Sequence, residues 1–147
     1  FDMYSGVKDY LEQQYYRAQR YGVVWTLMGR VRRVPEVNSY HKRIRAAGLR
    51  QAANMPIQGT GADWLKLVLG EIEEYVKEFE QAGQWVWPVN TPYDEVLMEV
   101  QEDLAEDVKE LLKSVMENVM TDKETGVRHF RVPIRADCKI SDRWVKE

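Results

Sequence analysis

The chain has 147 residues, 44% of them hydrophobic, which suffices for one domain core or part of a larger one, and no stretch approaches the length of a membrane span. The net charge of −3 conceals a segregation, since residues 1–70 carry 11 Lys and Arg against 5 Asp and Glu (net +6), and residues 71–147 carry 10 against 19 (net −9). An evenly acidic chain would argue against a nucleic-acid partner, but a segregated one does not, because one face can attract phosphates.

A helix and a short strand are predicted first. Residues 7–20 place apolar side chains at helical intervals, and Gly22 is suited to end that helix. Residues 23–26 are strand formers, after which Gly29 predicts a turn and Pro35 a break.

Two helices are predicted in the middle of the chain. Ser39 is a suitable N-cap for a helix that runs to about Met55 and is ended by Pro56. Residues 60–63 have a capping-box pattern, which predicts the start of a second, long amphipathic helix that Gly83 ends.

A β-hairpin, a helix and a strand complete an α+β order. Residues 84–100 are predicted to form the hairpin, in which Pro88 indicates a bulge or an edge position. Residues 102–120 have the spacing of an amphipathic helix, and residues 132–140 are predicted to form the last strand, with Cys138 as a small buried residue in it. This lone cysteine excludes an internal disulfide and fits a reducing compartment, so we expect a cytoplasmic protein.

Asp94 and Glu95 stand at the bend of the predicted hairpin, immediately before an alternating apolar strand. A rigid turn is a suitable place for carboxylates that hold a divalent cation while its other coordination positions stay open for substrate phosphates. An ordinary solvated turn explains the same pair, because 24 of the 147 residues are acidic. The hairpin taken alone favours the solvated turn.

Basic residues concentrate in one stretch of the chain. Seven Lys or Arg lie between Arg30 and Arg50, against the single Glu36. Arg30, Arg32 and Arg33 flank a turn, and the other four are predicted on the helix that follows. Such a compact set of donors suits a curved phosphate backbone better than one small anion, and the alternative is a solvated helix face.

Three stretches in a fixed order resemble one family. Residues 26–35 read TLMGRVRRVP, similar to T-L-x-G-R-x-R-x-x-P, and residues 54–63 read NMPIQGTGAD, similar to N-x-P-x-Q-G-T-x-A-D. Residues 93–96 read YDEV, where the family has H-D-E and a hydrophobic residue, known as motif C. Essentially the whole chain thus resembles the C-terminal part of the polymerase domain of family A DNA polymerases, the DNA polymerase I group. The resemblance implies that residues 1–147 form a palm-type antiparallel sheet, whose carboxylate-bearing hairpin packs against long helices, with adjoining fingers helices.

For the basic stretch, the resemblance implies contact with the template or primer backbone. Arg30, Arg32 and Arg33 would bind DNA phosphates around the turn. Arg50 occupies the family position at which an arginine touches the template.

Two amides also gain a role from the resemblance. Asn54 and Gln58 are similar to the family's minor-groove readers near the primer terminus, where every base pair presents acceptors in nearly the same place. They are four residues apart and would share one helix face only if the helix continued past Pro56. Without the resemblance, Asn54 reads as a helix-end cap and Gln58 as a turn residue.

The resemblance implies template-dependent nucleotidyl transfer, in which the primer 3′ hydroxyl attacks the α-phosphate of a dNTP. Asp94 would be the essential ligand and Glu95 the auxiliary ligand of a site for two Mg²⁺ ions, shared with the Asp of motif A. Tyr93 replaces the family's histidine and would contact the primer through its phenol. The partners implied are primer-template DNA and dNTP.

The motif A Asp and the fingers helix that grips dNTP precede the point in the family at which this chain begins, with Phe1. We therefore expect a fragment, a processed chain or one subunit of a split enzyme. On this expectation the chain is inactive until the N-terminal part of the polymerase, attached or separate, supplies those elements.

Two other functions compete with this interpretation. A non-catalytic nucleic-acid-binding module derived from a polymerase would keep the basic face and lose the chemistry. The joint presence of Asp94, Glu95, Asn54 and Gln58 favours the enzyme, because a mere binder needs none of them. A single-subunit RNA polymerase is disfavoured, because those relatives usually carry Ser at the position of Glu95.

Overall fold

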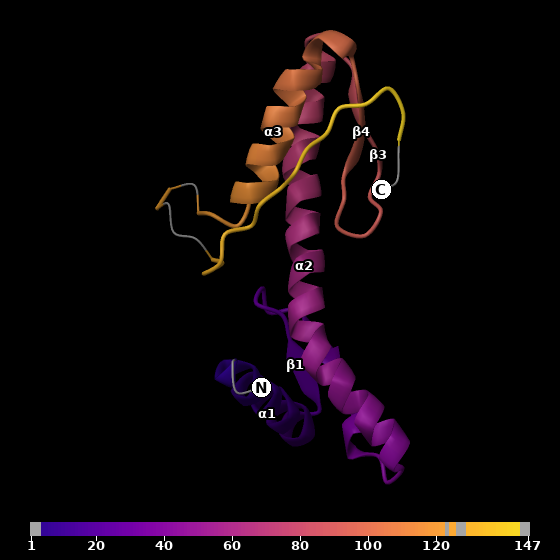
Figure 1. Cartoon of the computed structure of the whole chain (residues 1–147), viewed down its shortest axis with the longest axis vertical. Helices are drawn as coiled ribbons and strands as arrows, with labels where there is room; N and C mark the ends of the chain where they lie inside the picture. Colours follow the sequence, from indigo (N-terminus) through magenta and orange to yellow (C-terminus); the bar gives the residue numbers. More distant parts are fainter. Residues whose placement is uncertain (1–3, 123, 126–128, 145–147) are drawn as a thin grey trace. The chain divides into compact units, whose positions relative to one another are not determined.

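The computed structural model describes residues 4–122, 124–125 and 129–144 and divides into two compact units, Phe1–Asp63 and Trp64–Glu147. Helices and small antiparallel hairpins alternate along the chain, which confirms the α+β class (Figure 1). No helix in the described ranges is long and apolar enough to cross a membrane. The elements are α1 (Ser5–Tyr21), β1 (Val23–Trp25), β2 (Val31–Arg33), the 3₁₀ helix η1 (Pro35–Asn38), α2 (Lys42–Gln81), β3 (Val86–Asn90), β4 (Leu97–Val100), the 3₁₀ helix η2 (Glu102–Leu104) and α3 (Ala105–Asn118).

The first unit begins with the predicted helix and turn. Gly22 ends α1 in the left-handed conformation, with φ of 70°, and its N–H donates to the carbonyl oxygen of Ala18. Strands β1 and β2 then pair antiparallel, so that Val24 lies opposite Arg32. The loop between them turns at Gly29, whose φ is 83°, as the sequence predicted.

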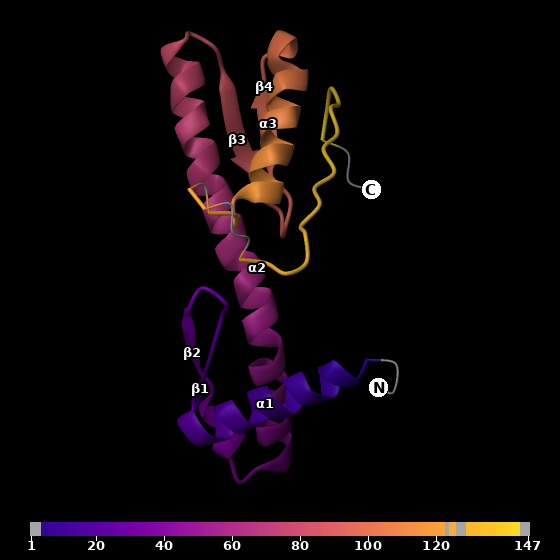
Figure 2. The ribbon, with the colours of Figure 1, turned by 90° about the vertical axis from the view of Figure 1, so that its left-hand side faces the viewer.

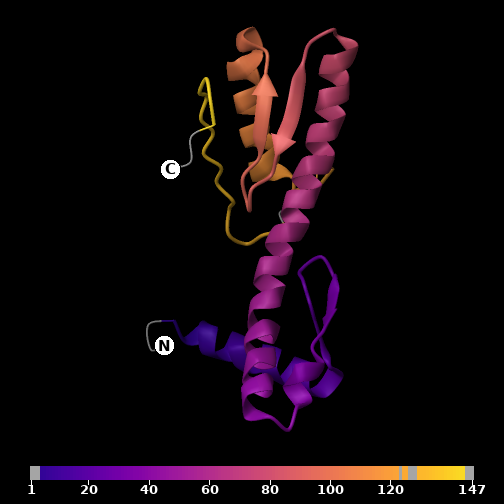
Figure 3. The same ribbon diagram turned by 90° about the vertical axis from the view of Figure 1, so that its right-hand side faces the viewer.

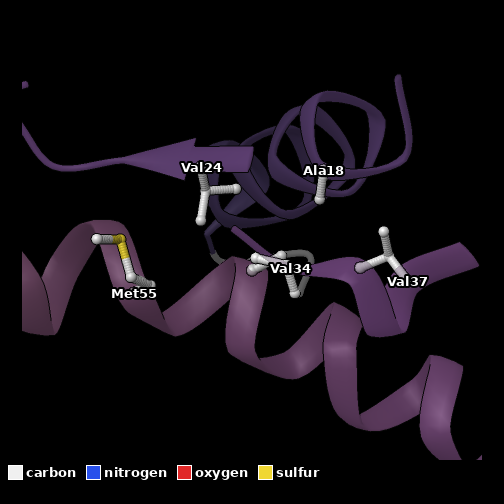
Figure 4. Close-up of a cluster of buried hydrophobic side chains, with 6 residues drawn as sticks. Ala18, Val24, Val34, Val37 and Met55 are labelled. Carbon is white, nitrogen blue, oxygen red and sulfur yellow. The ribbon is translucent and has the colours of Figure 1, made fainter. Parts of the chain in front are cut away.

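A small apolar core holds the first unit together. It draws side chains from α1, β1, the residue that follows β2, η1 and α2, which converge in Figure 4. Gly48 lets η1 approach α2, because a Cβ there would lie 2.8 Å from both the Cβ of Glu36 and the backbone nitrogen of Val37. The buried members of this core are Ala18, Val24, Val34, Val37, Ala52 and Met55.

Helix α2 is continuous, so the prediction of two helices separated at Pro56 is wrong. It runs from Lys42 to Gln81 with Pro56 inside it, and it starts after Ser39, whose hydroxyl accepts a hydrogen bond from the N–H of His41 at 3.2 Å. A proline within a helix costs about 3 kcal/mol in isolation. Burial of Ala52 and Met55, on the turn before the proline, offsets that cost.

The capping-box pattern at residues 60–63 therefore starts no helix. The Thr60 hydroxyl bonds back to the carbonyl oxygen of Pro56, four residues earlier, and it also accepts the N–H of Leu27 at 3.0 Å. Both polar functions of the side chain are thereby satisfied inside α2. The Thr60 hydroxyl therefore does not cap the start of a helix.

The second unit contains the remainder of α2, the β3–β4 hairpin and α3. In Figures 2 and 3 the hairpin and α3 lie beside this part of α2. As predicted, Gly83 terminates α2, with φ of 75°. Its N–H donates to the carbonyl oxygen of Glu80, and the N–H of Gln84 donates to the carbonyl oxygen of Phe79. These two hydrogen bonds form a Schellman motif. The buried core contains Trp64, Val68, Ile72, Val115 and Met120.

Residues 132–140 do not form the predicted last strand. The segment is irregular throughout, although Ala136 is buried and Ile134 packs against the core of the second unit. The N–H of Ala136 donates to Oε1 of Glu117 on α3 at 3.1 Å, so a side chain takes the place of a neighbouring strand. Cys138 is half-buried in this segment rather than buried in a sheet; burial raises the pKa of its thiol, an effect that nearby lysines partly oppose.

Candidate functional site

The β3–β4 hairpin ends in a tight turn. The N–H of Glu95 donates to the carbonyl oxygen of Pro92 at 3.0 Å, which closes the four-residue turn. Tyr93 occupies the second position with φ of 58°, in the left-handed region that favours glycine. On β3 the register shifts between Pro88 and Asn90, so the predicted bulge is present beside this turn.

Asp94 and Glu95 lie in this turn, and both are exposed. Because they precede the first residue of β4, Leu97, the alternation of strand side chains does not force them to opposite faces. Val96 and Met98, which follow, pack against the core of the second unit. The carboxylates therefore extend into solvent from a backbone that the core holds in place.

The carboxylate pair supplies part of a metal-binding set. Carboxylate oxygens are the hard donors that Mg²⁺ takes in proteins, so the chemistry of this pair fits that ion. Within the described ranges no group of three or more His, Cys, Asp or Glu side chains is placed to hold a metal. A complete magnesium site would thus need ligands beyond Asp94 and Glu95.

The basic residues of the first unit are held to different degrees. Arg33 on β2 and Arg50 on α2 are exposed. Arg32 is also exposed, and its Nη2 donates to Oε1 of Gln51 at 3.2 Å, which orients it beside α2. Arg45 reaches back to the carbonyl oxygen of Ser39 at 3.4 Å.

Arg30 differs from these arginines because its guanidinium forms an ion pair with a carboxylate as well as a hydrogen bond to a backbone carbonyl. Its Nε donates to Oδ1 of Asp63 at 2.6 Å, in an ion pair, and its Nη2 donates to the carbonyl oxygen of Gly59 at 2.9 Å. The Asp63 side chain is only 11% exposed. Sequence reasoning missed Asp63, because the two residues are 33 positions apart and no local pattern connects them.

Asn54 and Gln58 are exposed and lie on the same helix. Since α2 continues past Pro56, their spacing of four places them on one face, one turn apart. Arg50 precedes Asn54 by the same interval. The unbroken helix thus places a cation and two amides in one row.

Comparison with known proteins decides the family. Residues 1–146 match the sequence profile of DNA polymerase family A. The chain belongs to this family. Its resemblance to the C-terminal part of the family A polymerase domain is thereby confirmed.

Individual family A relatives agree along the chain. DNA polymerase I of Mycobacterium tuberculosis (strain ATCC 25618 / H37Rv) is 35% identical over 100 residues, or 68% of this chain and 11% of the relative. The thermostable DNA polymerase I of Thermus thermophilus is 34% identical over 145 residues, or 99% of this chain and 16% of the relative. The chain therefore spans between a tenth and a sixth of the length of these relatives.

A solved family A structure has the same fold. The POL domain of Pol1 from M. smegmatis, in complex with DNA primer-template and dNTP, matches with a TM-score of 0.73 and 33% sequence identity. The match covers 81% of this chain and 20% of that chain.

Proposed function

We propose that this chain is the C-terminal palm portion, with adjoining fingers elements, of a DNA-directed DNA polymerase. The observation that carries the proposal is the pair of exposed carboxylates, Asp94 and Glu95, on a hydrogen-bonded hairpin turn of a family A chain. A solved relative of the same fold was determined in complex with primer-template DNA and dNTP, which supports these as the partners.

Asp94 and Glu95 would hold Mg²⁺, with Asp94 as the essential ligand and Glu95 as the auxiliary one. Bound magnesium supplies positive charge that stabilises charge developing on the reacting phosphate and oxygens. The protein contributes rigidity, because the closed turn and the packing of Val96 and Met98 fix the backbone on both sides of the carboxylates. A further Asp, from motif A, would come from another segment of the polymerase.

The reaction is the attack of a primer 3′ hydroxyl on the α-phosphate of a dNTP, with release of pyrophosphate. Here the residues of this chain orient reactants rather than form covalent intermediates. Tyr93, 92% exposed beside the carboxylates, would donate a hydrogen bond from its phenolic hydroxyl to the primer end. The phenol reaches further than the imidazole that the family usually places there.

DNA would contact the first unit along β2 and α2. Arg32, Arg33 and Arg50 are exposed, and each is suited to a backbone phosphate. Asn54 and Gln58, in a row with Arg50, would donate to the minor-groove acceptors near the primer terminus. Amides there check base-pair shape without reading sequence, which a polymerase requires.

Substitution of the turn carboxylates tests the proposal. In the complete polymerase, Asp94→Ala is expected to lower the single-turnover extension rate by more than about 100-fold while DNA affinity changes little, because the lost group holds metal and not phosphate. Glu95→Ala should cost less. Glu99→Ala is the matched control, since this exposed carboxylate lies on the same hairpin within β4.

The competing function is a nucleic-acid-binding module without chemistry. This alternative predicts that the three variants, Asp94→Ala, Glu95→Ala and Glu99→Ala, change DNA affinity alone and leave the extension rate as it is. A larger loss of rate from Glu95→Ala than from Asp94→Ala would reverse the two assigned roles.

A further inference from the structure

Polar contacts hold the loop between β1 and β2 against α2. Three of them involve the loop backbone or Arg30: Leu27 N–H donates to Thr60 Oγ1 at 3.0 Å, Arg30 Nε to Asp63 Oδ1 at 2.6 Å, and Arg30 Nη2 to the Gly59 carbonyl oxygen at 2.9 Å. Within the loop, the Arg30 N–H donates to Thr26 Oγ1 at 3.1 Å. We call Thr26, Arg30, Gly59, Thr60 and Asp63 the loop anchor.

The members of the loop anchor other than Arg30 are largely withdrawn from solvent. Thr26 is 2% exposed and Thr60 9%, and the Asp63 side chain is 11% exposed, against 44% for Arg30. Buried polar groups are costly unless they are hydrogen-bonded, so loss of one partner destabilises the groups that remain. An exposed ion pair contributes little to stability. Where the carboxylate is nearly buried, removal of its cationic partner is costly, because it leaves a buried charge unpaired.

Gly59 shows how closely the loop approaches α2. A Cβ at this position would lie 2.6 Å from Cγ2 of Thr26 and 3.2 Å from Nη2 of Arg30. By contrast, Gly61, two residues further along the same helix, has no atom within 4 Å of an added Cβ. The close approach of the loop therefore gives a steric reason for glycine at position 59 and none for glycine at position 61.

We propose that Arg30 is a positioning residue that fixes the arginines of β2 relative to the DNA-contacting row on α2, rather than a phosphate ligand itself. The loop anchor leads directly into β2, which carries Arg32 and Arg33, and it fastens this strand to the helix that carries Arg50. The Arg30 charge is compensated by Asp63 at 2.6 Å, which leaves little attraction for a second anion. This inference rests on the proposed function, because it assigns the division of labour among DNA-binding residues.

Asp63→Asn distinguishes the two roles of Arg30 by the sign of its effect. If Arg30 is a phosphate ligand, removal of the competing carboxylate frees it and DNA binding tightens. If Arg30 positions β2, the same change loosens the loop and DNA binding weakens several-fold, although a negative charge has been removed. Fluorescence anisotropy of the complete polymerase with a labelled primer-template measures the difference.

Salt dependence supplies a second readout, which mere loss of structure does not change. Arg32→Ala should reduce the slope of log affinity against log salt by nearly one unit, because one phosphate contact is lost. Arg30→Ala should weaken binding with the slope unchanged, because Arg32 and Arg33 still reach their phosphates in the complex and only the cost of ordering β2 rises. A slope reduced by Arg30→Ala as much as by Arg32→Ala would overturn the proposal.

A double-mutant cycle and hydrogen exchange test the anchor without DNA. Arg30→Ala and Asp63→Asn should each speed exchange of the Leu27 amide, and the double variant should be no worse than either single one. Gly59→Ala should speed the same exchange, whereas Gly61→Ala, the matched control, should leave it unchanged. Additive effects of the two single variants would refute the anchor.

The proposed function and the positioning role of Arg30 can fail separately. Absence of salt-dependent DNA binding by the wild-type polymerase would refute the proposed function and leave the double-mutant cycle intact. Tighter DNA binding by Asp63→Asn would refute the positioning role of Arg30 and leave the proposed function intact.

Discussion

Tyr93 holds an unfavourable backbone conformation next to the candidate catalytic carboxylates. Among the described non-glycine residues, Tyr93 is the one with a positive φ, at 58°. Such a conformation costs about 1 kcal/mol for a residue with a Cβ. The hydrogen bond from Glu95 to Pro92 and the bulged pairing of β3 with β4 hold the turn in this shape. The exposed phenol is thereby presented at the bend.

Substitution of Tyr93 should separate stability from function. Tyr93→Gly is expected to raise the free energy of unfolding by about 1 kcal/mol, because glycine adopts positive φ without penalty. It should also slow primer extension, since the ring and its hydroxyl are lost. Chemical denaturation and extension kinetics measure the two effects.

Tyr93→Phe is the matched variant, because it retains the ring and the strained backbone and removes only the hydroxyl. It should leave stability unchanged and reproduce the slower extension. Equal extension rates for Tyr93→Phe and wild type would show that the Tyr93 hydroxyl makes no contact that extension requires.

At the scale of elements, a tyrosine of α1 bonds to α2 shortly before the proline of that helix. Tyr10 Oη donates to the carbonyl oxygen of Ala53 at 2.8 Å, three residues before Pro56, where the proline ring crowds the helix carbonyls. Burial raises the pKa of the Tyr10 phenol above its ordinary value of 10.0, and the positive charge of Arg17 opposes this only partly. The neutral phenol is thus the form that the folded chain stabilises.

This hydrogen bond predicts a pH dependence of stability. Because the folded pKa is raised, the contribution of Tyr10 is fully present below pH 10.0 and is lost as pH rises through the folded pKa. Tyr10→Phe should therefore lower stability by about 1 kcal/mol at neutral pH. The difference between the variant and wild type should shrink above pH 10.0 in thermal melts; a constant difference would contradict the assignment.

The row on α2 makes a second prediction at this scale. Arg50→Ala should weaken primer-template binding for every sequence and reduce the slope of log affinity against log salt by about 0.9, because one phosphate contact is lost. Asn54→Ala and Gln58→Ala should leave the slope unchanged, since amides release no counterions, and should impair extension most from mismatched primer ends. Binding titrations at several salt concentrations check the slopes.

Identical slopes for wild type and Arg50→Ala would identify the basic stretch as an ordinary solvated surface. Lys66→Ala provides the control, because this exposed cation lies on the same helix two turns beyond Gln58.

At the scale of the whole molecule, the carboxylate pair supplies only part of the ligands that the proposed polymerase reaction requires. The described residues contain no group of three metal-binding side chains, whereas the proposed reaction uses two Mg²⁺ ions and a further Asp. The 147-residue chain alone should therefore give no extended primer in a gel assay with Mg²⁺ and dNTPs. Addition of a polypeptide that carries motif A and the dNTP-binding helix should restore synthesis, and extension by the rigorously purified chain alone would contradict the prediction.

The sequence by itself determined the features that depend on a few neighbouring residues. Gly22 and Gly83 end their helices because a left-handed residue satisfies the last carbonyls, and this chemistry is local. Pro88 marked the bulge, and the strand formers around it predicted a hairpin with Asp94 and Glu95 at its bend. The family followed from motifs of the same local kind, each of which is a short run of residues.

Only the tertiary structure decided the features that depend on distant partners. Whether Pro56 ends a helix is settled by packing of the turn before it, and the capping box of Thr60 is cancelled by a bond to Leu27, 33 residues away. The partner of Arg30 is fixed in the same way, as is the irregular course of residues 132–140, whose Ala136 bonds to a side chain of α3. Local propensities amount to about 1 kcal/mol per residue or less for most residue types, so the burial and hydrogen bonding of a folded neighbour outweigh them.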